Sequence, residues 1–558
     1  MPQQRLAADI SGAAGSGVSV DVGSSASGNY LAGQHAVRER DFGAAADMLE
    51  RALQSTPDDE ELRRRAFLAK LSEGDVAGSL ELAKLIMERE TAEPIAGLVV
   101  IVDAIKSGDL ARASMEIERY PDRGFSGFVK PLLFAWAEVA QGRTEAAIAA
   151  LQPLSRQAGL TVLYELHSAL ISDVAGNSAA AVEHYQRAAE AAPRATLRVV
   201  QGLGRHYEIA GESEKATALY RTYIAENPES VVLEPALARI EKGEKPGLLV
   251  SNAAEGIAET LFDIASTMTR DNSAQLALIY GRLAMYLRPD FDLAQMLVAG
   301  ILESLQRYDD AIAVYRQIRP ASSLHWSARL RIAGNLEASE RDEEAIKLLE
   351  ELTREDPRRP DAYVTLGDLY RSNKQFESAV DAYDLAIKTT GAIDQRHWTI
   401  LYSRGIALER ARQWERAERD FERALELNPE QPYVLNYLGY SWVDQGINLD
   451  RARDMIERAV ELRPNDGYIV DSLGWALYRM NDFGGAVEKL ERAVELRPED
   501  PTINDHLGDA YWRVGRHNEA RFQWQRALAL KPEPEAVAAI ETKIEKGLPQ
   551  VRQSGKDG

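Results

Sequence analysis

The chain has 558 residues, 45% of them hydrophobic and 27% charged, which is too long for one compact core and normal for a folded protein. Asp and Glu number 87 against 66 Lys and Arg, a formal net charge of −21, and this balance argues against nucleic-acid phosphates as the main partner. The absence of cysteine excludes disulfides, thiolate metal sites, cysteine nucleophiles and a lipid-modified N-terminal cysteine on the chain as given.

Residues 1–29 are rich in Gly, Ser and Ala and lack the apolar core of a signal peptide, so we predict a disordered leader there. The most apolar stretch, "GLVVIVDAI" at 97–105, is shorter than the roughly 18 residues that span a bilayer. The chain as written therefore predicts no transmembrane segment and a cytoplasmic location.

A 34-residue period covers the chain from about Ser27 to about Lys546. One unit has, at positions 7, 8, 20, 24, 27 and 32 of this frame, Leu473, Gly474, Ala486, Leu490, Ala493 and Pro498. The next unit has, at the same positions, Leu507, Gly508, Ala520, Trp524, Ala527 and Pro532. These residues resemble the tetratricopeptide repeat (TPR) family. The resemblance implies an all-α fold, a right-handed superhelical α-solenoid in which each repeat is a pair of antiparallel helices.

The small residues in the pattern have a physical reason. Glycine inside a helix costs roughly 1 kcal/mol relative to alanine, so its return in the same frame needs a structural cause. Positions 8 and 20 are predicted to lie where the two helices of a repeat cross most closely, and a large side chain at Gly474 would hold the helices apart. Proline at position 32 ends the second helix, and neighbouring repeats must stack because no repeat buries its apolar face alone.

The repeat starts predict about fourteen helix hairpins. They fall near residues 26, 60, 94, 128, 162, 197, 258, 292, 326, 360, 398, 432, 467 and 501. The segment "EKPGLLVSNAAEG" follows one helix where a partner helix of normal spacing is expected, which predicts a joint between two arrays. The predicted organisation is a disordered leader at 1–29, an N-terminal TPR-like array at 30–230, the joint at 231–257, a C-terminal TPR array at 258–532, a capping helix at 533–547 and a disordered tail at 548–558.

No residue pattern indicates catalysis. The eight histidines form no closely spaced metal-binding pair, and the sequence contains no GxSxG, GxxxxGK[ST] or GxGxxG motif. The repeats leave no space of roughly 100 residues for a catalytic domain. We therefore predict a protein that is not an enzyme and binds no metal or other cofactor.

Aromatic and acidic residues recur where a groove is expected. In TPR arrays, positions 2, 5, 9 and 12 of the first helix line the concave face. Aromatic side chains favour recognition because they offer a large contact area at little entropy cost. The predicted partner-binding residues are Tyr402, Tyr433, Asn436, Tyr440, Tyr468, Asp471, Trp475, Tyr478, Asp505, Asp509 and Trp512.

Trp475 and Tyr440 are the predicted main contacts, and the Asn436 amide is predicted to hold a peptide backbone. The alternative interpretation is that some of these aromatic residues pack between adjacent repeats. Chaperone-binding TPR domains clamp a C-terminal carboxylate with Lys and Asn at positions 5 and 9, whereas this chain has Asp505 and Asp509 there. The expected ligand is therefore a basic or neutral segment of another protein.

The C-terminal third resembles a bacterial subfamily of long TPR proteins in "LNYLGYSW", "GYIVDSLGWALYRM" and "RPEDPTINDHLGDAYWR". Its best-understood members are outer-membrane lipoproteins that act as adaptors for a carboxyl-terminal processing protease and deliver cell-wall hydrolases to it. The resemblance implies a scaffold in the periplasm or cell envelope. This chain departs from the subfamily in having neither a lipobox cysteine nor a visible export signal.

These features together predict a scaffold or adaptor that binds peptide segments or partner proteins in an aromatic, acidic groove, and that does not bind nucleic acid. Two alternatives stay open. One is a helical-repeat RNA-binding protein, a family with a basic concave face, and the other is an accessory subunit of an enzyme complex. The sequence does not fix the oligomeric state.

Overall fold

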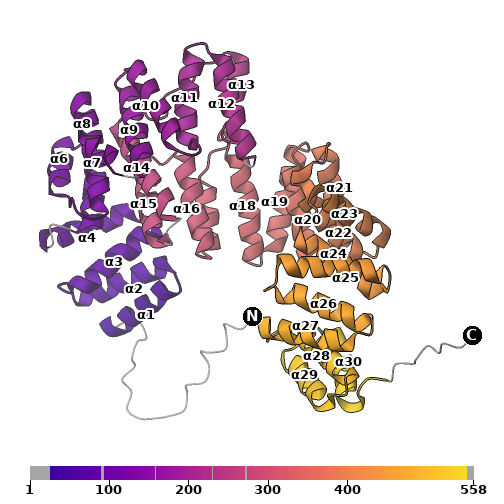
Figure 1. Ribbon diagram of the computed structural model, residues 1–558. Helices are drawn as coiled ribbons and strands as arrows, with labels where there is room; N and C mark the ends of the chain where they lie inside the picture. The colour runs from indigo at the N-terminus through magenta and orange to yellow at the C-terminus, as the bar shows by residue number, and fades with distance from the viewer. Residues whose placement is uncertain (1–24, 90–92, 158, 229, 270–272, 550–558) are drawn as a thin grey trace, which may run out of the picture. The chain divides into compact units, whose positions relative to one another are not determined.

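The computed structural model describes residues 25–89, 93–157, 159–228, 230–269 and 273–549. All regular elements within these ranges are helical, and most consecutive helices pair as hairpins (Figure 1). The predicted all-α helical-repeat array is confirmed. No helix in these ranges is both long and apolar enough to cross a bilayer. Most of the predicted leader (1–24) and of the predicted tail (550–558) lies outside the described residues.

The chain forms two compact units, unit 1 up to Ala345 and unit 2 from Ile346. Unit 1 begins with six hairpins: α1 (Ala26–Arg38) with α2 (Phe42–Ser55), α3 (Glu60–Glu73) with α4 (Val76–Arg89), α5 (Pro94–Ser107) with α6 (Leu110–Arg119), α7 (Ser126–Ala140) with α8 (Thr144–Ser155), α9 (Thr161–Val174) with α10 (Ser178–Ala191), and α11 (Leu197–Ile209) with α12 (Ser213–Glu226). It continues with α13 (Glu234–Lys242), α14 (Ala253–Met268) with α15 (Ala274–Leu287), α16 (Asp292–Ser304) with α17 (Tyr308–Tyr315), and α18 (His325–Ala338). The division between the units falls inside α19 (Asp342–Glu355).

Unit 2 stacks five hairpins and a last helix (Figure 1). A 3₁₀ turn, η2 (Gln395–His397), precedes the second hairpin. The helices are α20 (Pro360–Ser372) with α21 (Phe376–Thr390), α22 (Trp398–Arg410) with α23 (Trp414–Leu427), α24 (Pro432–Gln445) with α25 (Leu449–Leu462), α26 (Gly467–Arg479) with α27 (Phe483–Leu496), α28 (Pro501–Arg513) with α29 (His517–Ala529), and the unpaired α30 (Pro534–Lys546).

The hairpins of unit 2 begin at residues suited to helix starts. The Asp500 carboxylate accepts hydrogen bonds from the backbone N–H groups of Thr502 and Ile503, and Pro501 occupies the first helical position. Asp466 caps α26 in the same way. An acidic cap satisfies N–H groups that have no partner inside the helix, and proline loses nothing there because its missing N–H would be unpaired anyway. These local signals determine where each first helix begins, and thereby which of its residues face the inner side of unit 2.

Gly474 lies at the predicted close crossing of α26 and α27. A Cβ built on Gly474 would stand 2.6 Å from Leu490 Cγ and 3.2 Å from the Leu490 backbone nitrogen. Because both helices are packed on further repeats, neither can move away freely. The close approach, rather than helix propensity, accounts for glycine at this position.

Replacing Gly474 with leucine is therefore expected to lower the unfolding free energy by about 1–3 kcal/mol through overpacking. The matched control is Gly484→Leu on α27, since a Cβ on Gly484 would meet no atom closer than 3.9 Å. Urea unfolding of both variants measures the difference. Equal midpoints for Gly474→Leu and wild type would show that the crossing tolerates a large side chain.

The segment predicted as a joint at 231–257 contains α13, an irregular stretch, and the first turns of α14. The Asn252 side chain accepts from the Glu255 N–H at 3.0 Å, while the Glu255 carboxylate accepts from the Ser251 N–H at 2.9 Å. This reciprocal capping starts α14 at Ala253, five residues before the repeat start predicted at 258. The predicted leader at 1–29 also overlaps a helix, because α1 begins at Ala26.

Candidate functional site

The inner face of each unit is the face formed by the first helices of its hairpins. In unit 1 this face is covered by the chain itself: α14 packs against α7 and α9, and α15 packs against α3, α4 and α5 (Figure 1). The hairpin α14–α15 therefore lies inside the array that precedes it, instead of simply extending the stack.

Two buried contacts hold α14 there. The Arg198 guanidinium of α11 donates to both carboxylate oxygens of Glu259, at 2.5 and 2.6 Å, and Glu259 is fully buried. Gly256 lies flat against the buried indole of Trp136, where an added Cβ would stand 2.2 Å from the ring. The Trp136 Nε1–H donates to His167 Nδ1 at 3.1 Å. Since these groups are buried and paired, the inner face of unit 1 is not open to a partner along α14.

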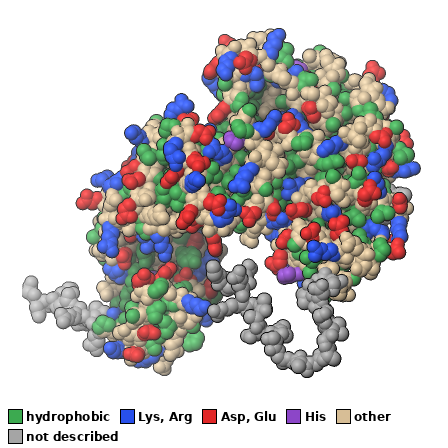
Figure 2. Space-filling model, turned by 180° about the vertical axis from the view of Figure 1, so that it is seen from behind, with side chains coloured by type: hydrophobic (Ala, Val, Ile, Leu, Met, Phe, Trp, Pro, Cys, Tyr) green, Lys and Arg blue, Asp and Glu red, His purple; other side chains and the backbone are tan. Residues whose placement is uncertain are grey.

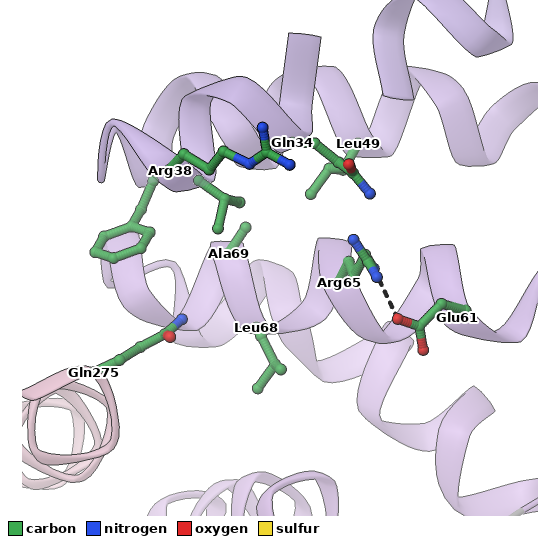
Figure 3. Close-up of a pocket in the computed structure, with 10 residues that line it drawn as sticks. Gln34, Arg38, Leu49, Glu61, Arg65, Leu68, Ala69 and Gln275 are labelled. Carbon is green, nitrogen blue, oxygen red and sulfur yellow. Dashed lines mark hydrogen bonds and ion pairs between the residues drawn. The ribbon is translucent and has the colours of Figure 1, made fainter. Parts of the chain in front are cut away.

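Among the openings in unit 1, one lies beside its first two hairpins. It is a pocket of about 340 Å³ between α1, α2 and α3, with Gln275 of α15 at its side (Figure 3). Arg65 and Glu61 form an ion pair at 2.7 Å beside it, and its walls also include Leu49 and Leu68. Its lining contains no His, Ser or Cys that would form a nucleophile–base pair.

In unit 2 the first helices contact one another along the stack, α20 with α22, α24 with α26 and α26 with α28. The space-filling view shows a hollow in unit 2 with hydrophobic side chains inside it, among acidic and basic ones (Figure 2). The predicted partner-binding residues belong to these first helices, and the structure separates them into three groups and a pair of exposed tyrosines.

The first group lies on α22 and α24. Tyr402 packs among the rings of Phe421 and Tyr437, with centroids 6.1 Å apart in both cases, so its contacts fit packing between neighbouring repeats. Asn436 and Tyr440 are half-buried, and burial raises the pKa of the Tyr440 hydroxyl to about 12. The Asn436 Oδ1 atom is buried and has no hydrogen-bond partner among the described residues. An orphaned acceptor of this kind is suited to a donor brought by a ligand.

Two tyrosines mark the rim of the face. Tyr433 is 41% exposed and Tyr468 is 52% exposed. The guanidinium of Arg463 lies 5.9 Å from the Tyr433 ring centroid, and that of Arg497 lies 5.2 Å from the Tyr468 centroid. Equivalent positions of two consecutive repeats thus present the same pair of an aromatic ring and a cation.

The second group is a stack on α26. The half-buried indole of Trp475 lies nearly parallel to the Tyr478 ring, with centroids 4.9 Å apart, and it also stacks on the His506 imidazole, with centroids 4.1 Å apart. The Asp471 carboxylate, which is buried, contacts His506 Nδ1 at 3.0 Å. Arg513 donates to the Tyr478 hydroxyl at 3.2 Å. Trp475 is therefore fixed in orientation before any partner arrives.

His506 makes this part of unit 2 sensitive to pH. Burial alone would lower the pKa of His506, but the Asp471 carboxylate outweighs it and raises the pKa above its usual value, with smaller help from Asp505 and Asp509. In the unfolded chain the pKa is near 6.5. The charged imidazole therefore stabilises the fold fully below about pH 6.5, and this contribution is lost as the pH rises through the folded-state pKa.

We expect the unfolding free energy of wild type to fall more between pH 6 and pH 8 than that of His506→Gln, which cannot titrate there. Urea unfolding of both proteins across this range measures the difference. Parallel pH profiles would contradict a raised pKa for His506.

The third group, Asp505, Asp509 and Trp512 on α28, contacts α30 and the residues after it. Lys543 Nζ lies 2.7 Å from Asp505 and 2.9 Å from Asp509. The Trp512 Nε1–H donates to the Leu548 carbonyl oxygen at 3.2 Å. These three side chains are thus occupied by the chain's own C-terminal segment.

No set of three or more His, Asp or Glu side chains within the described ranges is arranged to hold a metal ion. The inner face of unit 2 instead offers rings, one amide and paired charges, which suit contacts with polypeptide.

A sequence profile described as tetratricopeptide repeat matches residues 132–196, 332–393, 402–467 and 472–536. These four segments are tetratricopeptide repeats. The last two include Tyr440 and Trp475, so the candidate contacts stand within recognised TPR sequence. No curated protein matches the chain.

Several solved structures of helical-repeat proteins are similar to the chain at low identity. The APC/C hetero-tetramer Cut9–Hcn1 has 15% identity over 93% of this chain and 96% of that chain, with a TM-score of 0.39. YrrB, a TPR protein with an unusual peptide-binding site, has 21% identity over 35% and 97%, with a TM-score of 0.28. MamA from Desulfovibrio magneticus RS-1 has 23% identity over 30% and 94%, with a TM-score of 0.26. No statement about partners follows from similarities at this level.

Two residues of the inner face, His506 and Lys543, are not among the predicted partner-binding residues. His506 stands at position 6, outside positions 2, 5, 9 and 12, yet it reaches Asp471 of the preceding repeat. If the 34-residue period is continued from 501 into α30, Lys543 falls at position 9. Continuing the period past the last complete repeat would have identified Lys543 as an inner residue.

Proposed function

We propose that this TPR protein is a non-catalytic scaffold or adaptor that binds a polypeptide segment of a partner on the inner face of unit 2. The observation that carries the proposal is the preformed stack of the half-buried Trp475 on Tyr478 and His506, within an array of tetratricopeptide repeats. A ring already held by two stacking contacts loses little entropy on binding, which is a feature of residues that dominate interface energies.

The charges and polar groups of the face favour a particular partner chemistry. Asp471, Asp505 and Asp509 belong to the inner helices, and the net charge of the chain is −21. Asp471 is paired with His506, and Asp505 and Asp509 are paired with Lys543. The net charge of the chain, and the two aspartates near Lys543 once that lysine is displaced, would attract basic segments and repel acidic ones and nucleic-acid backbones. The unpartnered Asn436 Oδ1 would accept a backbone N–H of a bound segment.

The proposal that the partner is a cell-envelope protease, or a substrate delivered to it, rests on the sequence resemblance of the C-terminal third alone. It requires a location outside the cytoplasm. Fractionation of cells that make the native, full-length product tests this location, and recovery only in the cytoplasmic fraction would contradict the delivery role.

Trp475→Ala and Tyr440→Ala are expected to weaken partner binding at least about tenfold each, a typical effect for central aromatic residues of an interface. The measurement is quantitative recovery of partner proteins with the purified, tagged full chain, after circular dichroism has shown that each variant is folded. The matched control is Phe522→Ala on α29, which removes an aromatic ring that is 60% exposed and lies on a second helix. Equal recovery with all three variants and wild type would contradict binding at the inner face.

A further inference from the structure

The C-terminal segment from Glu533 to Pro549 covers the last repeat. Ile540 of α30 is buried against the core formed by Leu507, Tyr511 and Trp524. Ile540 is the one buried residue of α30, and the other side chains of this helix are exposed or half-buried. Ala536, Ile544 and Leu548 are partly buried against the same core. The segment is therefore attached by one fully buried side chain, by these partly buried ones and by its connection to α29, and terminal elements of this kind open at low free energy.

The polar contacts of α30 resemble those of a bound ligand. Burial raises the pKa of Asp509, and the neighbouring Lys543 opposes this shift. Burial alone would lower the pKa of Lys543, but Asp509 and Asp505 outweigh it and raise the pKa. The Trp524 Nε1–H also donates to Asp509 at 2.9 Å. Two carboxylates held this closely on the inner face need a cation, because leaving a buried charge unpaired is costly.

The residues after α30 contact the face through one required glycine and through main-chain oxygens. Gly547 has a positive φ of 71°, and a Cβ there would stand 1.9 Å from the Trp512 ring, so only glycine fits. The Trp512 Nε1–H donates to the Leu548 carbonyl oxygen at 3.2 Å, and Arg513 donates to the Pro549 carbonyl oxygen at 2.6 Å. Side-chain donors thus bind main-chain oxygens, which are present in every polypeptide.

We infer that residues 533–549 are a displaceable resident of the inner face of the last repeat, and that they compete there with a partner segment of the same chemistry. That segment is an amphipathic helix that places a lysine between Asp505 and Asp509, followed by a glycine against Trp512 and by main-chain oxygens that accept from Trp512 and Arg513. The inference rests on the proposed function, since it assigns the partner class and a built-in competitor to the same inner face.

The test uses the full chain and a fluorescein-labelled synthetic peptide of residues 533–549 as the probe. In wild type, the attached segment occupies the site most of the time, which reduces the apparent affinity for the probe by the fraction of open protein. Lys543→Glu places a third negative charge beside Asp505 and Asp509 and is expected to release α30. This variant should bind the probe at least about tenfold more tightly than wild type, with faster amide hydrogen exchange in α30.

The matched control is Lys546→Glu, which makes the same charge change at an exposed residue of the same helix, whereas it is Lys543 that pairs with Asp505 and Asp509. The affinity of this control for the probe should equal that of wild type. A second probe that carries Lys543→Glu should bind Lys543→Glu protein at least about tenfold more weakly than the native probe, an effect typical of a lost buried charge pair. If Lys543→Glu protein proves unfolded by circular dichroism, Ile540→Ala loosens α30 without adding a charge and carries the same expectation.

Equal probe binding by wild type and the folded, loosened variants would overturn the inference, as would unchanged hydrogen exchange in α30. Equal binding of the two probes would overturn the lysine requirement. This assay contains no external partner, so its outcome is independent of the partner recovery measured with Trp475→Ala. If the probe binds as expected while Trp475→Ala recovers as much partner as wild type, the proposed function is contradicted and the displaceable C-terminal segment is not.

Discussion

Replacing Glu259 with alanine is expected to lower the unfolding free energy of unit 1 by about 3–5 kcal/mol, because it leaves a buried guanidinium without its anion. Glu259 is fully buried and bonds Arg198 through both carboxylate oxygens. Burial alone would lower the pKa of Arg198, but Glu259 outweighs it and raises the pKa, so Arg198 stays charged in the fold. The charge cannot escape by deprotonation when its partner is removed.

Two controls separate this effect from a general loss of charge. Glu60→Ala removes one of the two carboxylate partners of Arg89 in an exposed ion pair of 2.8 Å, the other being Asp58, and its effect should be much smaller because water screens this pair. The double variant Arg198→Met with Glu259→Leu replaces both charges by apolar groups and should recover most of the loss. Urea unfolding of the four proteins gives the comparison. A loss for Glu259→Ala no larger than that for Glu60→Ala would contradict a buried ion pair between Arg198 of α11 and Glu259 of α14.

The second large effect is expected at Trp136, whose replacement by alanine should destabilise unit 1 by about 3–5 kcal/mol. Trp136 is fully buried on α7, and its ring forms the surface on which Gly256 of α14 lies. Alanine removes that surface together with the hydrogen bond to His167. The loss should therefore appear at α14 as well as at α7.

Amide hydrogen exchange measures this directly, since amides of α14 should exchange faster in Trp136→Ala while those of unit 2 do not change. Leu31→Ala on α1 is the control, because that side chain is 65% exposed and should change stability by less than about 0.5 kcal/mol. Unchanged exchange in α14 would contradict its place against the first helices of unit 1.

The positions of most helices in unit 2 follow from the sequence. Repeat starts predicted at 360, 432, 467 and 501 coincide with the first residues of α20, α24, α26 and α28. Three of these helices begin with proline, and acidic caps stand before α26 and α28. Such signals act over four residues and do not depend on the rest of the chain, which is why a single sequence suffices to find them.

The place of α14 depends on contacts between residues far apart in the chain. The pattern Asn252–Glu255 is a capping signal, and it marks the start of α14 better than the 34-residue period does. The pairing of Arg198 with Glu259, 61 residues later, has no such local signal. A period of helix pairs describes each repeat and its neighbour, but it does not show that a later hairpin packs on the inner face of earlier ones.

In the candidate site, too, the sequence predicts the helix on which a residue lies but not what surrounds its side chain. The frame places Tyr440 and Trp475 on first helices, where the structure leaves both half-buried. The repeat frame also predicts Asp509 as a partner-binding residue of a first helix, yet Asp509 is buried and paired with Lys543. Repeat positions state which helix face a residue occupies, whereas the coverage of that face by α30 depends on a segment beyond the last complete repeat.

The most direct test of binding at the inner face of unit 2 is site-specific photo-crosslinking from position 440 in cells. The variant Tyr440→p-benzoylphenylalanine keeps an aromatic ring at the site, and the same substitution at Phe522 provides the control. We predict adducts to a separate polypeptide from position 440 that disappear when Trp475→Ala is added, and none of these adducts from position 522. Adducts that form equally from both positions, or that persist without Trp475, would contradict the account.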